Sequence, residues 1–375
     1  MRYYIIAGEA SGDLHGGNLI KELKRLHPGA EIRCWGGDKM QAAGGELVKH
    51  YKDLAFMGFT EVLKNLHTIF RNLDLCKADI LSFKPDALIL IDYPGFNLRI
   101  AKWAKQQDLF KSGKCKTIFY ISPQVWAWKE NRVKMMKECI DKMIVILPFE
   151  KDFYKERWNW EVEYVGHPLV DVIEEFSRES GVGSRESEII ALLPGSRKQE
   201  VLKKLPIMLQ VAKYFPSYQF VVAKAPGLED SFYYEMLKPY NNVSYVSNKT
   251  YELLSKAKAA LVTSGTATLE TALFGVPEVI CYKGNSLSYQ IAKRLIKIKF
   301  IGLVNLIMDK EVVKELIQDE LTPSNLQREL NLLLNDEAKK TQVDNDYAAL
   351  KDLLSKGGNA SKNAARIIYD VGCRM

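Results

Sequence analysis

The chain has 375 residues, of which 47% are hydrophobic and 26% charged, with six cysteines and a formal net charge of +7. A chain of this length can bury a core without disulfides, and its scattered cysteines include no CxxC pair, which excludes zinc-ribbon and thioredoxin-like motifs. No apolar run approaches the roughly 18 residues that span a bilayer or resembles a secretory signal, so we expect a cytoplasmic protein. The mild positive charge allows phosphate, nucleic acid or a lipid surface as a partner without selecting one.

Short apolar runs alternate with helical patterns along the whole chain. Continuous apolar runs are typical of parallel strands buried on both faces, and strands that alternate with helices indicate βαβ units. The sequence therefore predicts an α/β fold with two Rossmann-like, doubly wound domains and helices at the C-terminus. The candidate strands are "RYYIIA", "DALILID", "KTIFYIS" and "KMIVIL" in the first half, and "EIIALL", "YQFVVA", "AALVTS" and "PEVICY" in the second.

The composition changes at "DVIEEFSRESGVGSRES", which is charged, rich in Gly and Ser, and free of apolar runs. Such a segment is typical of a linker between domains. We predict one α/β domain over residues 1–172, a linker over 173–187, a second α/β domain over 188–355 and a C-terminal helix over 356–375.

The first strand runs into a loop of small residues and then an amphipathic helix, "IIAGEASGDLHGGNLIKELKRL". The glycine spacing differs from G-x-G-x-x-G, which removes the best support for a nicotinamide-dependent oxidoreductase. Ligands of α/β folds bind at the carboxyl ends of strands. We therefore regard Glu9, Ser11, Gly12 and Asp13 as candidate binding residues, against the alternative of a tight strand-to-helix turn.

An apolar helical pattern, "MGFTEVLKNLHTIFRNLDLC", and a later basic one, "NSLSYQIAKRLIKIKF", both suit a lipid surface. The alternative for both is ordinary core packing with a solvated face. The candidate lipid contacts are Phe59, Leu63, Leu66 and Phe70 in the first pattern and Lys293, Arg294 and Lys297 in the second.

In "ALILIDYPGFNL", Asp92 follows directly after a buried strand. Partial desolvation in a cleft would raise the pKa of its carboxyl group and make it a plausible general base. The alternative is a helix cap or a turn stabilised by Pro94 and Gly95. After the next strand, Trp126 and Trp128 could stack on a ligand ring or pack in the core.

"LLPGSRKQEV" combines a strand end, small residues and a helix start. Gly195 and Ser196 allow a ligand to approach the backbone, and the free N–H groups of a helix N-terminus attract anions. Arg197 adds a guanidinium whose geometry matches phosphate oxygens. The alternative is a serine cap beside a solvated arginine.

"LVTSGTATLETALFG" repeats this arrangement at a later strand end. Ser264, Gly265 and Thr266 open a helix, and Glu270 lies about one turn further along, where it could accept hydrogen bonds from ribose hydroxyls. The alternative is a helix cap and a surface glutamate. Two such turns in one domain favour a nucleoside diphosphate as the ligand.

Several catalytic patterns are absent from the sequence. It contains no HExxH, no GxSxG and no GxxxxGK[ST], and no histidine pair has metal-ligand spacing. The sequence thus contains no recognisable signature of a metal site or of a cofactor.

Nine motifs together closely resemble the lipid A disaccharide synthase family, in order from about Ala7 to Leu321. They are "AGEASGD", "MGFTEVL", "IDYPGFN", "SPQVWAW", "LPFE", "GHPLVD", "LLPGSR", "SGTATLE" and "LVNLI". The resemblance implies a GT-B type glycosyltransferase whose two domains face each other across a cleft. The first domain would bind the acceptor and lipid, and the second would bind the UDP-sugar donor.

The resemblance also implies the reaction and its setting. UDP-2,3-diacylglucosamine and 2,3-diacylglucosamine 1-phosphate would give the β-1,6-linked tetraacyl disaccharide 1-phosphate and UDP, with inversion and without a metal. The enzyme would bind peripherally to the cytoplasmic face of the inner membrane of a Gram-negative-type bacterium. A homodimer is compatible with the polar helical tail, and nucleic acid is not expected as a partner.

Roles for individual residues follow from the same resemblance. Asp92 would be the general base and Arg197 the diphosphate-binding arginine, while Glu9 and Asn305 match positions that are important in the family. Glu270 matches a glutamate that fits the nucleotide ribose. Many members carry a second acid in the "IDxPxFN" loop, where this chain has Gly95.

Two other functions are compatible with the same motifs. Another GT-B transferase, such as one of peptidoglycan synthesis, would share the fold and nucleotide site but use a different UDP-sugar. A non-catalytic UDP-sugar binding protein would need Arg197 and Glu270 but not Asp92.

Overall fold

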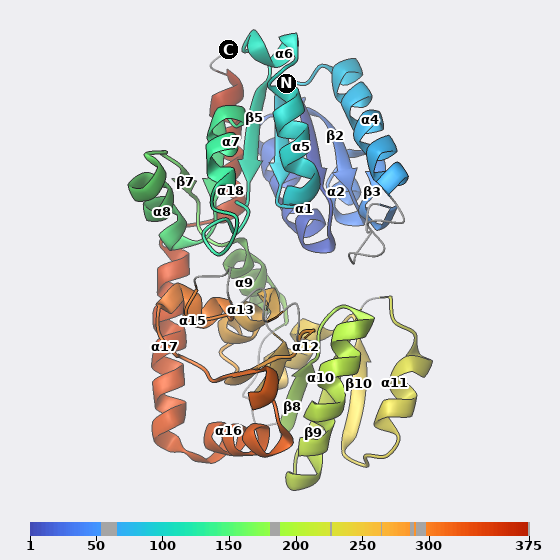
Figure 1. The fold of residues 1–375 in the computed structure, drawn as a ribbon, viewed down its shortest axis with the longest axis vertical. Helices are drawn as coiled ribbons and strands as arrows, with labels where there is room; N and C mark the ends of the chain where they lie inside the picture. The colour runs from blue at the N-terminus through green and yellow to red at the C-terminus, as the bar shows by residue number, and fades with distance from the viewer. Residues whose placement is uncertain are drawn as a thin grey trace. The chain divides into compact units, whose positions relative to one another are not determined.

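The computed structural model describes residues 1–53, 66–180, 188–225, 227–263, 265–285, 289 and 298–373 (Figure 1). The chain divides into two compact units. Unit 1 comprises Met1–Pro168 and Ser355–Met375, and unit 2 comprises Leu169–Leu354.

Unit 1 is built on a seven-stranded parallel sheet with the order β3-β2-β1-β4-β5-β6-β7. The strand order reverses between β1 and β4, and in doubly wound folds such a switch point opens the crevice in which ligands bind. The loops that follow β1 and β4 therefore occupy the position where chemistry is expected. The strands are β1 (Arg2–Ala7), β2 (Glu31–Gly36), β3 (Glu46–His50), β4 (Ala87–Ile91), β5 (Lys116–Tyr120), β6 (Lys142–Val145) and β7 (Glu163–Tyr164).

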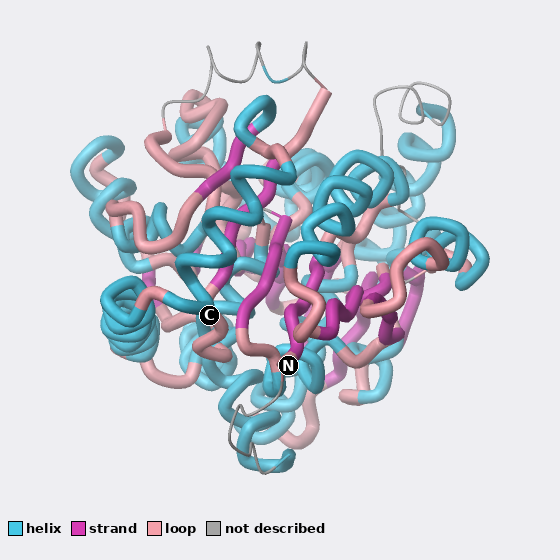
Figure 2. Tube along the Cα trace, turned by 90° about the horizontal axis from the view of Figure 1, so that it is seen from below, coloured by secondary structure: helices cyan, strands magenta, loops and turns pink. Residues whose placement is uncertain are grey.

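Helices surround the strands of the protein, as the cyan and magenta tubes of Figure 2 show. The last helix of the chain, α18 (Ala360–Cys373), packs against α1 (Ala10–Leu26) and so belongs to the first unit. The other helical elements are α2 (Asp38–Ala42), η1 (Tyr51–Asp53), α4 (Leu66–Phe83), α5 (Pro94–Ala104), α6 (Asp108–Lys111), α7 (Arg132–Cys139) and α8 (Pro148–Trp158).

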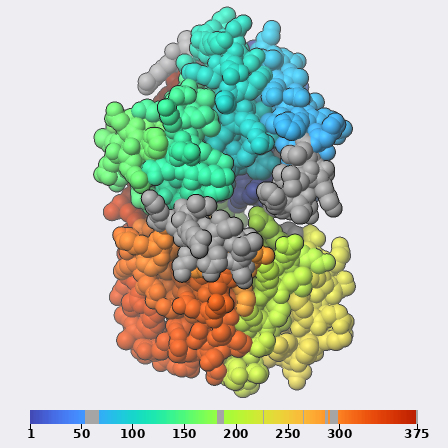
Figure 3. All heavy atoms as spheres, viewed as in Figure 1, coloured from blue at the N-terminus to red at the C-terminus, as the bar shows by residue number. Residues whose placement is uncertain are grey.

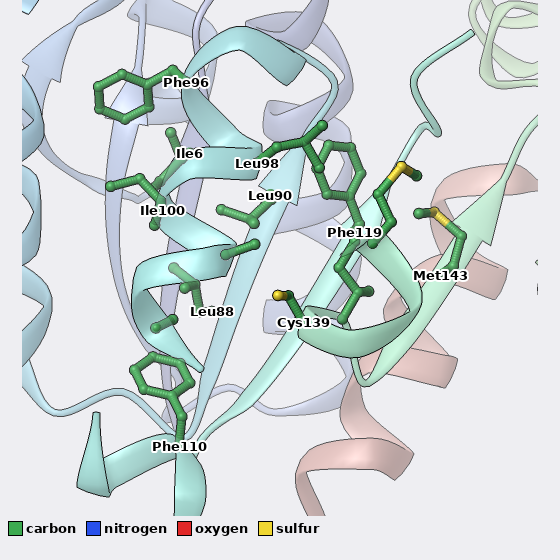
Figure 4. Packing of buried hydrophobic residues seen from close by; sticks show 14 of the residues in the cluster. Ile6, Leu88, Leu90, Phe96, Leu98, Ile100, Phe110, Phe119, Cys139 and Met143 are labelled. Carbon is green, nitrogen blue, oxygen red and sulfur yellow. The ribbon is translucent and has the colours of Figure 1, made fainter. Parts of the chain in front are cut away.

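The central strands of unit 1 are apolar on both faces because both faces are covered. Leu88 and Leu90 of β4 are fully buried beside Ile100 of α5 in the cluster that Figure 4 shows. The same cluster includes Phe119 of β5 and Met143 of β6. Burial of each such side chain contributes about 1.5–3 kcal/mol, so this packing holds the strand ends, and the loops after them, in fixed positions.

Unit 2 repeats the design with a six-stranded parallel sheet, in the order β10-β9-β8-β11-β12-β13. Its switch point lies between β8 and β11. The strands are β8 (Ile189–Leu193), β9 (Gln219–Lys224), β10 (Val243–Ser247), β11 (Ala259–Thr263), β12 (Glu278–Tyr282) and β13 (Glu315–Ile317). The helical elements are α9 (Pro168–Ser180), α10 (Lys198–Val211), η2 (Ala212–Tyr214), α11 (Asp230–Leu237), α12 (Thr250–Lys256), α13 (Thr266–Leu273), α15 (Leu303–Met308), η3 (Gln318–Glu320), α16 (Pro323–Asn335) and α17 (Glu337–Ser355).

The predicted linker over 173–187 is partly wrong, because its first residues belong to α9. Leu169, Val170 and Ile173 are buried on one face of that helix. The charged residues between them form its solvated face and hid the apolar stripe. Residues 181–187 lie outside the described residues. No helix in the described ranges is long and apolar enough to cross a membrane.

Candidate active site

Glu9 and Asp92 lie at the switch point of the sheet in unit 1. Strands β1 and β4 pair in parallel, with Ala7 opposite Ile91, and each acid follows its strand within two residues. Glu9 is the residue before α1, has an extended backbone and makes no capping hydrogen bond with its side chain. The topology therefore brings together two acids that are far apart in the sequence.

The backbone at Asp92 is strained. Asp92 and Tyr93 have φ angles of 43° and 49°, a left-handed conformation that side chains other than glycine rarely adopt. Hydrogen bonds hold it in place: Asp92 N donates to Tyr120 O at 3.1 Å, and Asn97 Nδ2 donates to Asp92 O at 2.7 Å. The Tyr93 ring lies against Gly8, where any Cβ would collide with it. Strain of this kind persists at functional sites because the surrounding structure enforces it.

The environment of Asp92 suits a general base. Burial, and to a smaller extent the charge of Glu9, raise the pKa of its carboxyl group to about 6, although a hydrogen bond from the N–H of Tyr93 opposes the shift. A carboxylate with a pKa close to neutrality can take a proton from a substrate more effectively than an ordinary aspartate.

The two tryptophans of the "SPQVWAW" motif differ in their surroundings. Trp126 is half-buried and donates its indole N–H to Glu150 Oε1 at 3.2 Å. Glu150 is buried, accepts from Leu147 N at 3.0 Å, and has a pKa raised by burial to about 7. Trp128 is exposed, with Lys129 Nζ 4.2 Å from its ring centroid. The structure therefore gives Trp126 a structural partner and leaves Trp128 available to a ligand.

The other residues of the first loop are also either buried with a structural role or exposed. Asp13 is buried and accepts hydrogen bonds from the backbone N–H groups of Gly37, Lys39 and Met40 at 2.7–3.1 Å, so it fixes the start of α2. This structural role replaces the predicted ligand contact. Gly12 packs closely against Ala7, whereas Ser11 is exposed in the first turn of α1.

Two buried histidines lie in unit 1. Burial lowers the pKa of His15 to about 4 and that of His167 to about 3, and the charge of His15 contributes to the second shift. Both imidazoles are therefore neutral near pH 7.

Unit 2 contains a cavity of about 470 Å³ at the carboxyl ends of β8, β9 and β11. Both predicted strand-to-helix turns open into it, because β8 and β11 are neighbours at the switch point. The residues that line it are Leu193, Gly195, Ser196, Arg197, Glu200, Ala223, Lys224, Ala225, Thr250, Thr263, Gly265, Thr266, Ala267 and Glu270.

Each turn contains a glycine with a positive φ angle, which other residues rarely adopt. Gly195 has a φ angle of +117°, and a Cβ there would press against Glu200. Gly265 has a φ angle of +133° and precedes α13, with open space where a Cβ would stand. Both turns thus present bare backbone to the cavity. Ser264, which lies between Thr263 and Gly265, is outside the described residues.

Arg197 stands at the N-terminus of α10 with its side chain 58% exposed. Its Nη1 lies 3.5 Å from Glu200 Oε1, a loose contact that leaves most of the guanidinium donors free for an anion. The N–H groups of the first helical turn add partial positive charge at the same place. Arg197 and α10 together form a site suited to phosphate.

Glu270 also lines the cavity. Tyr251 donates its hydroxyl proton to Glu270 Oε1 at 3.1 Å, and burial raises the pKa of the carboxyl group. A carboxylate can accept about four hydrogen bonds, so Glu270 retains capacity for the hydroxyls of a ligand.

Asn305 does not reach the cavity. It is fully buried in α15, where Nδ2 donates to Val313 O at 2.8 Å and to Glu315 Oε1 at 3.0 Å. Its Oδ1 accepts from Val312 N and Val313 N. These four bonds tie α15 to the start of β13, so the predicted substrate contact is replaced by a structural role.

Several polar residues of this site belong to none of the predicted motifs. Lys224 lines the cavity and is paired with Asp230, and Lys204 is buried behind it with Nζ bonded to Thr263 Oγ1. Their signal in the sequence is faint. Lys204 falls on the apolar face of α10 with Val201 and Leu205, which is an unusual position for a lysine.

The predicted lipid contacts are only partly described. Phe70 of α4 is 58% exposed. Leu66 begins α4, and its side chain is outside the described part. Phe59, Leu63, Lys293, Arg294 and Lys297 lie outside the described residues. Within the described ranges, no group of three or more His, Cys, Asp or Glu side chains could hold a metal ion.

Comparison with known proteins gives consistent results. The family model for lipid-A-disaccharide synthetase matches residues 3–368. A lipid-A-disaccharide synthase of Geobacter metallireducens is 38% identical over 99% of this chain and 97% of its own length. Lipid-A-disaccharide synthase 1 of Legionella pneumophila is 40% identical over 94% of this chain and 93% of its own length.

Solved structures are similar in fold at low sequence identity. The UDP-GlcNAc 2-epimerase of Neisseria meningitidis bound to UDP-GlcNAc has a TM-score of 0.66 at 13% identity, covering 100% of both chains. The calicheamicin glycosyltransferase CalG4 has a TM-score of 0.60 at 18% identity, covering 100% of this chain and 98% of its own.

Proposed function

The chain belongs to the lipid-A-disaccharide synthetase family, and from this membership we propose that it joins UDP-2,3-diacylglucosamine to 2,3-diacylglucosamine 1-phosphate. The products would be the β-1,6-linked tetraacyl disaccharide 1-phosphate and UDP. At the coarser level, the chain is a glycosyltransferase of lipid A biosynthesis with a GT-B type fold.

The donor would bind in the cavity of unit 2, and this cavity carries the proposal. Two glycine turns, Arg197 and the N-terminus of α10 meet there, which is the arrangement that a diphosphate requires. Glu270 would accept hydrogen bonds from the ribose. The similar fold of an epimerase bound to UDP-GlcNAc supports the same class of ligand.

The acceptor would bind in unit 1, near Asp92. Its 6-hydroxyl oxygen attacks C1 of the donor sugar, the bond from C1 to the diphosphate oxygen breaks, and UDP leaves with the electron pair. The hydroxyl proton passes to Asp92, and the anomeric centre inverts. Arg197 and the helix N-terminus stabilise the charge that develops on the diphosphate. One base and no covalent nucleophile suffice for this displacement.

Gly95 sets this chain apart within the acceptor loop. It is exposed, and a Cβ there would meet nothing within 4 Å. The fold therefore has room for the second acid that the family pattern carries. Without that acid, Asp92 is the carboxylate of this loop that can act as the base.

Membrane contact is the remaining part of the proposal. Helix α4 exposes Phe70, Leu75 and Leu81, of which Phe70 and Leu81 lie on the same side, and Figure 3 shows this helix (light blue) at the surface of unit 1. Large exposed apolar side chains on one helix suit acyl chains or a bilayer. We place the side of α4 that carries Phe70 and Leu81 against the cytoplasmic side of the inner membrane, with the basic sequence 285–300 as a second contact.

The test is mass spectrometry of products after the purified protein is mixed with both substrates in detergent. A tetraacyl disaccharide phosphate together with UDP would establish the reaction. UDP without disaccharide would show that the nucleotide half is right and the acceptor wrong, as expected for a transferase of another pathway. No turnover and no UDP binding would refute the proposal.

A further inference from the structure

A lysine is buried directly behind the nucleotide cavity of unit 2. Lys204 of α10 is only 4% exposed and lies among Val201, Leu205 and Met208 on the face that α10 turns to the sheet. Lysine is almost never buried to this degree without a partner, because desolvating an ammonium group is costly. The partner that Lys204 has is therefore informative.

That partner is Thr263, the last residue of β11. Lys204 Nζ is hydrogen-bonded to Thr263 Oγ1, and Thr263 itself lines the cavity. An ammonium group can only donate, so the threonine oxygen accepts and its own proton must be donated elsewhere. Among the described residues, no acceptor takes that proton. The hydroxyl is thus set to donate to a ligand in the cavity.

Lys204 differs from the other cationic side chains around the cavity in its ion-pair partners. Arg197 has Glu200 as a loose ion-pair partner at 3.5 Å, and Lys224 is paired with Asp230. Within the described chain, Lys204 has no carboxylate within ion-pair distance. Burial lowers the pKa of its amino group, the charges of Glu200 and Cys281 oppose that shift, and those of Arg197 and Lys203 add to it. Because Lys204 has no carboxylate partner within the described chain, its charge is available to an anion in the cavity.

We propose that Lys204 is a positioning residue for the donor diphosphate. It holds the Thr263 hydroxyl so that its proton is donated to a phosphate oxygen, and its buried charge attracts the same anion through a medium that screens it poorly. This inference rests on the proposed binding of UDP in the cavity.

The experiment compares UDP binding by calorimetry in matched variants of the full chain. Lys204→Met keeps the length and apolar character of the side chain but removes the charge and the hydrogen bond. Lys203→Met removes the same charge from the neighbouring, exposed position. Loss of a charge-assisted hydrogen bond predicts roughly 10- to 100-fold weaker UDP binding for Lys204→Met. Lys203→Met should bind UDP nearly as wild type does.

A second pair of variants tests the coupling through Thr263. Thr263→Val should weaken UDP binding by a similar factor, and Thr263→Ser, which keeps the hydroxyl, should restore most of it. In the double variant of Lys204→Met and Thr263→Val, the losses should not multiply, because both remove the same hydrogen-bond chain. If Lys204→Met fails to fold, UDP binding by Thr263→Val and Thr263→Ser still tests whether the Thr263 hydroxyl donates to the diphosphate.

The outcomes separate this inference from the proposed function. If wild type does not bind UDP, the proposed function and this inference both fall. If wild type binds UDP but Lys204→Met binds as tightly as Lys203→Met, only the role of Lys204 is overturned. The role of Lys204 would also be overturned if the losses of UDP affinity multiplied in the double variant, or if Thr263→Val and Thr263→Ser bound UDP equally well.

Discussion

Glu9 and Asp92 follow two directly paired strands, and the charge of Glu9 raises the pKa of Asp92. Strands β2 and β3 and the helices around them separate the two acids in the chain, so the switch point of the sheet creates their proximity. Burial is the larger cause of the shift, and Glu9 adds to it. This relationship links the fold of unit 1 to the pH at which a base at Asp92 can work.

The pH dependence of activity should report this relationship. A base must be deprotonated, so kcat/KM should rise with pH through the pKa of Asp92, at about 6. Glu9→Gln removes the neighbouring charge and should move that rise to lower pH, although burial keeps it above the range of an exposed aspartate. The measurement is a pH profile of kcat/KM for both proteins, with Glu22→Gln as an acid-to-amide control on the same helix. An unmoved profile in Glu9→Gln would contradict the coupling.

Asp92→Asn should separate catalysis from donor binding. The amide keeps the size of the side chain and its backbone hydrogen bonds but cannot accept the proton, so kcat should fall by roughly 10²–10⁴-fold. UDP affinity should be unchanged, because Asp92 belongs to unit 1 and the cavity is lined by residues of unit 2. Steady-state rates and UDP calorimetry test both parts, and Asp108→Asn on exposed α6 is the matched control. A variant that retains near-normal kcat would exclude Asp92 as the base.

Much of the fold follows from local sequence, and the exceptions have a physical pattern. All eight predicted strands are present, because each is an apolar run buried on both faces. The strands that were not predicted are β3, β7, β10 and β13, which lie at the sheet edges, and β2, which adjoins an edge. These strands are partly exposed, so their apolar residues do not form a continuous run.

Some residues of the candidate site could be located from the sequence, and the roles of others could not. Asp92, Gly195, Arg197 and Gly265 could be located because they follow apolar strands at the places where α/β folds bind ligands. The structural roles of Asp13 and Asn305 could not, because their partners come from other elements of the fold. A polar residue at a strand end looks the same in sequence whether it faces a ligand or the backbone of a neighbouring segment.

Arg197 should matter through its geometry as well as its charge. Arg197→Lys keeps the charge but loses the planar fork that holds two phosphate oxygens, so UDP affinity should fall roughly 10-fold. Arg197→Met should lose more, and kcat should fall with it, because charge develops on the diphosphate as the bond breaks. Calorimetry and steady-state kinetics measure these effects, with Lys198→Met at the next, exposed position as the control. Equal UDP affinity in Arg197→Lys and wild type would refute bidentate binding.

Glu278 should destabilise the folded protein. It is fully buried in β12, and neither carboxylate oxygen has a hydrogen-bond partner within the described chain. Burial raises its pKa well above the usual range, and the charge of Glu315 on β13 acts in the same direction. Glu315 itself accepts bonds from Ile301 N and Gly302 N. Of these two acids, Glu278 is therefore the one whose burial is not offset by hydrogen bonds within the described chain.

The sign of the effect follows from the direction of the pKa shift. The folded protein keeps the Glu278 proton while the unfolded chain releases it above its ordinary pKa, so this residue lowers stability increasingly as pH rises above about 4.3. Glu278→Met, of similar volume, should raise the free energy of unfolding by about 1–3 kcal/mol near pH 7. Urea unfolding at pH 5 and pH 8 should show the larger gain at pH 8, with exposed Glu337→Gln near zero at both. A loss of stability at pH 8 would mean that Glu278 has a compensating partner in the folded protein.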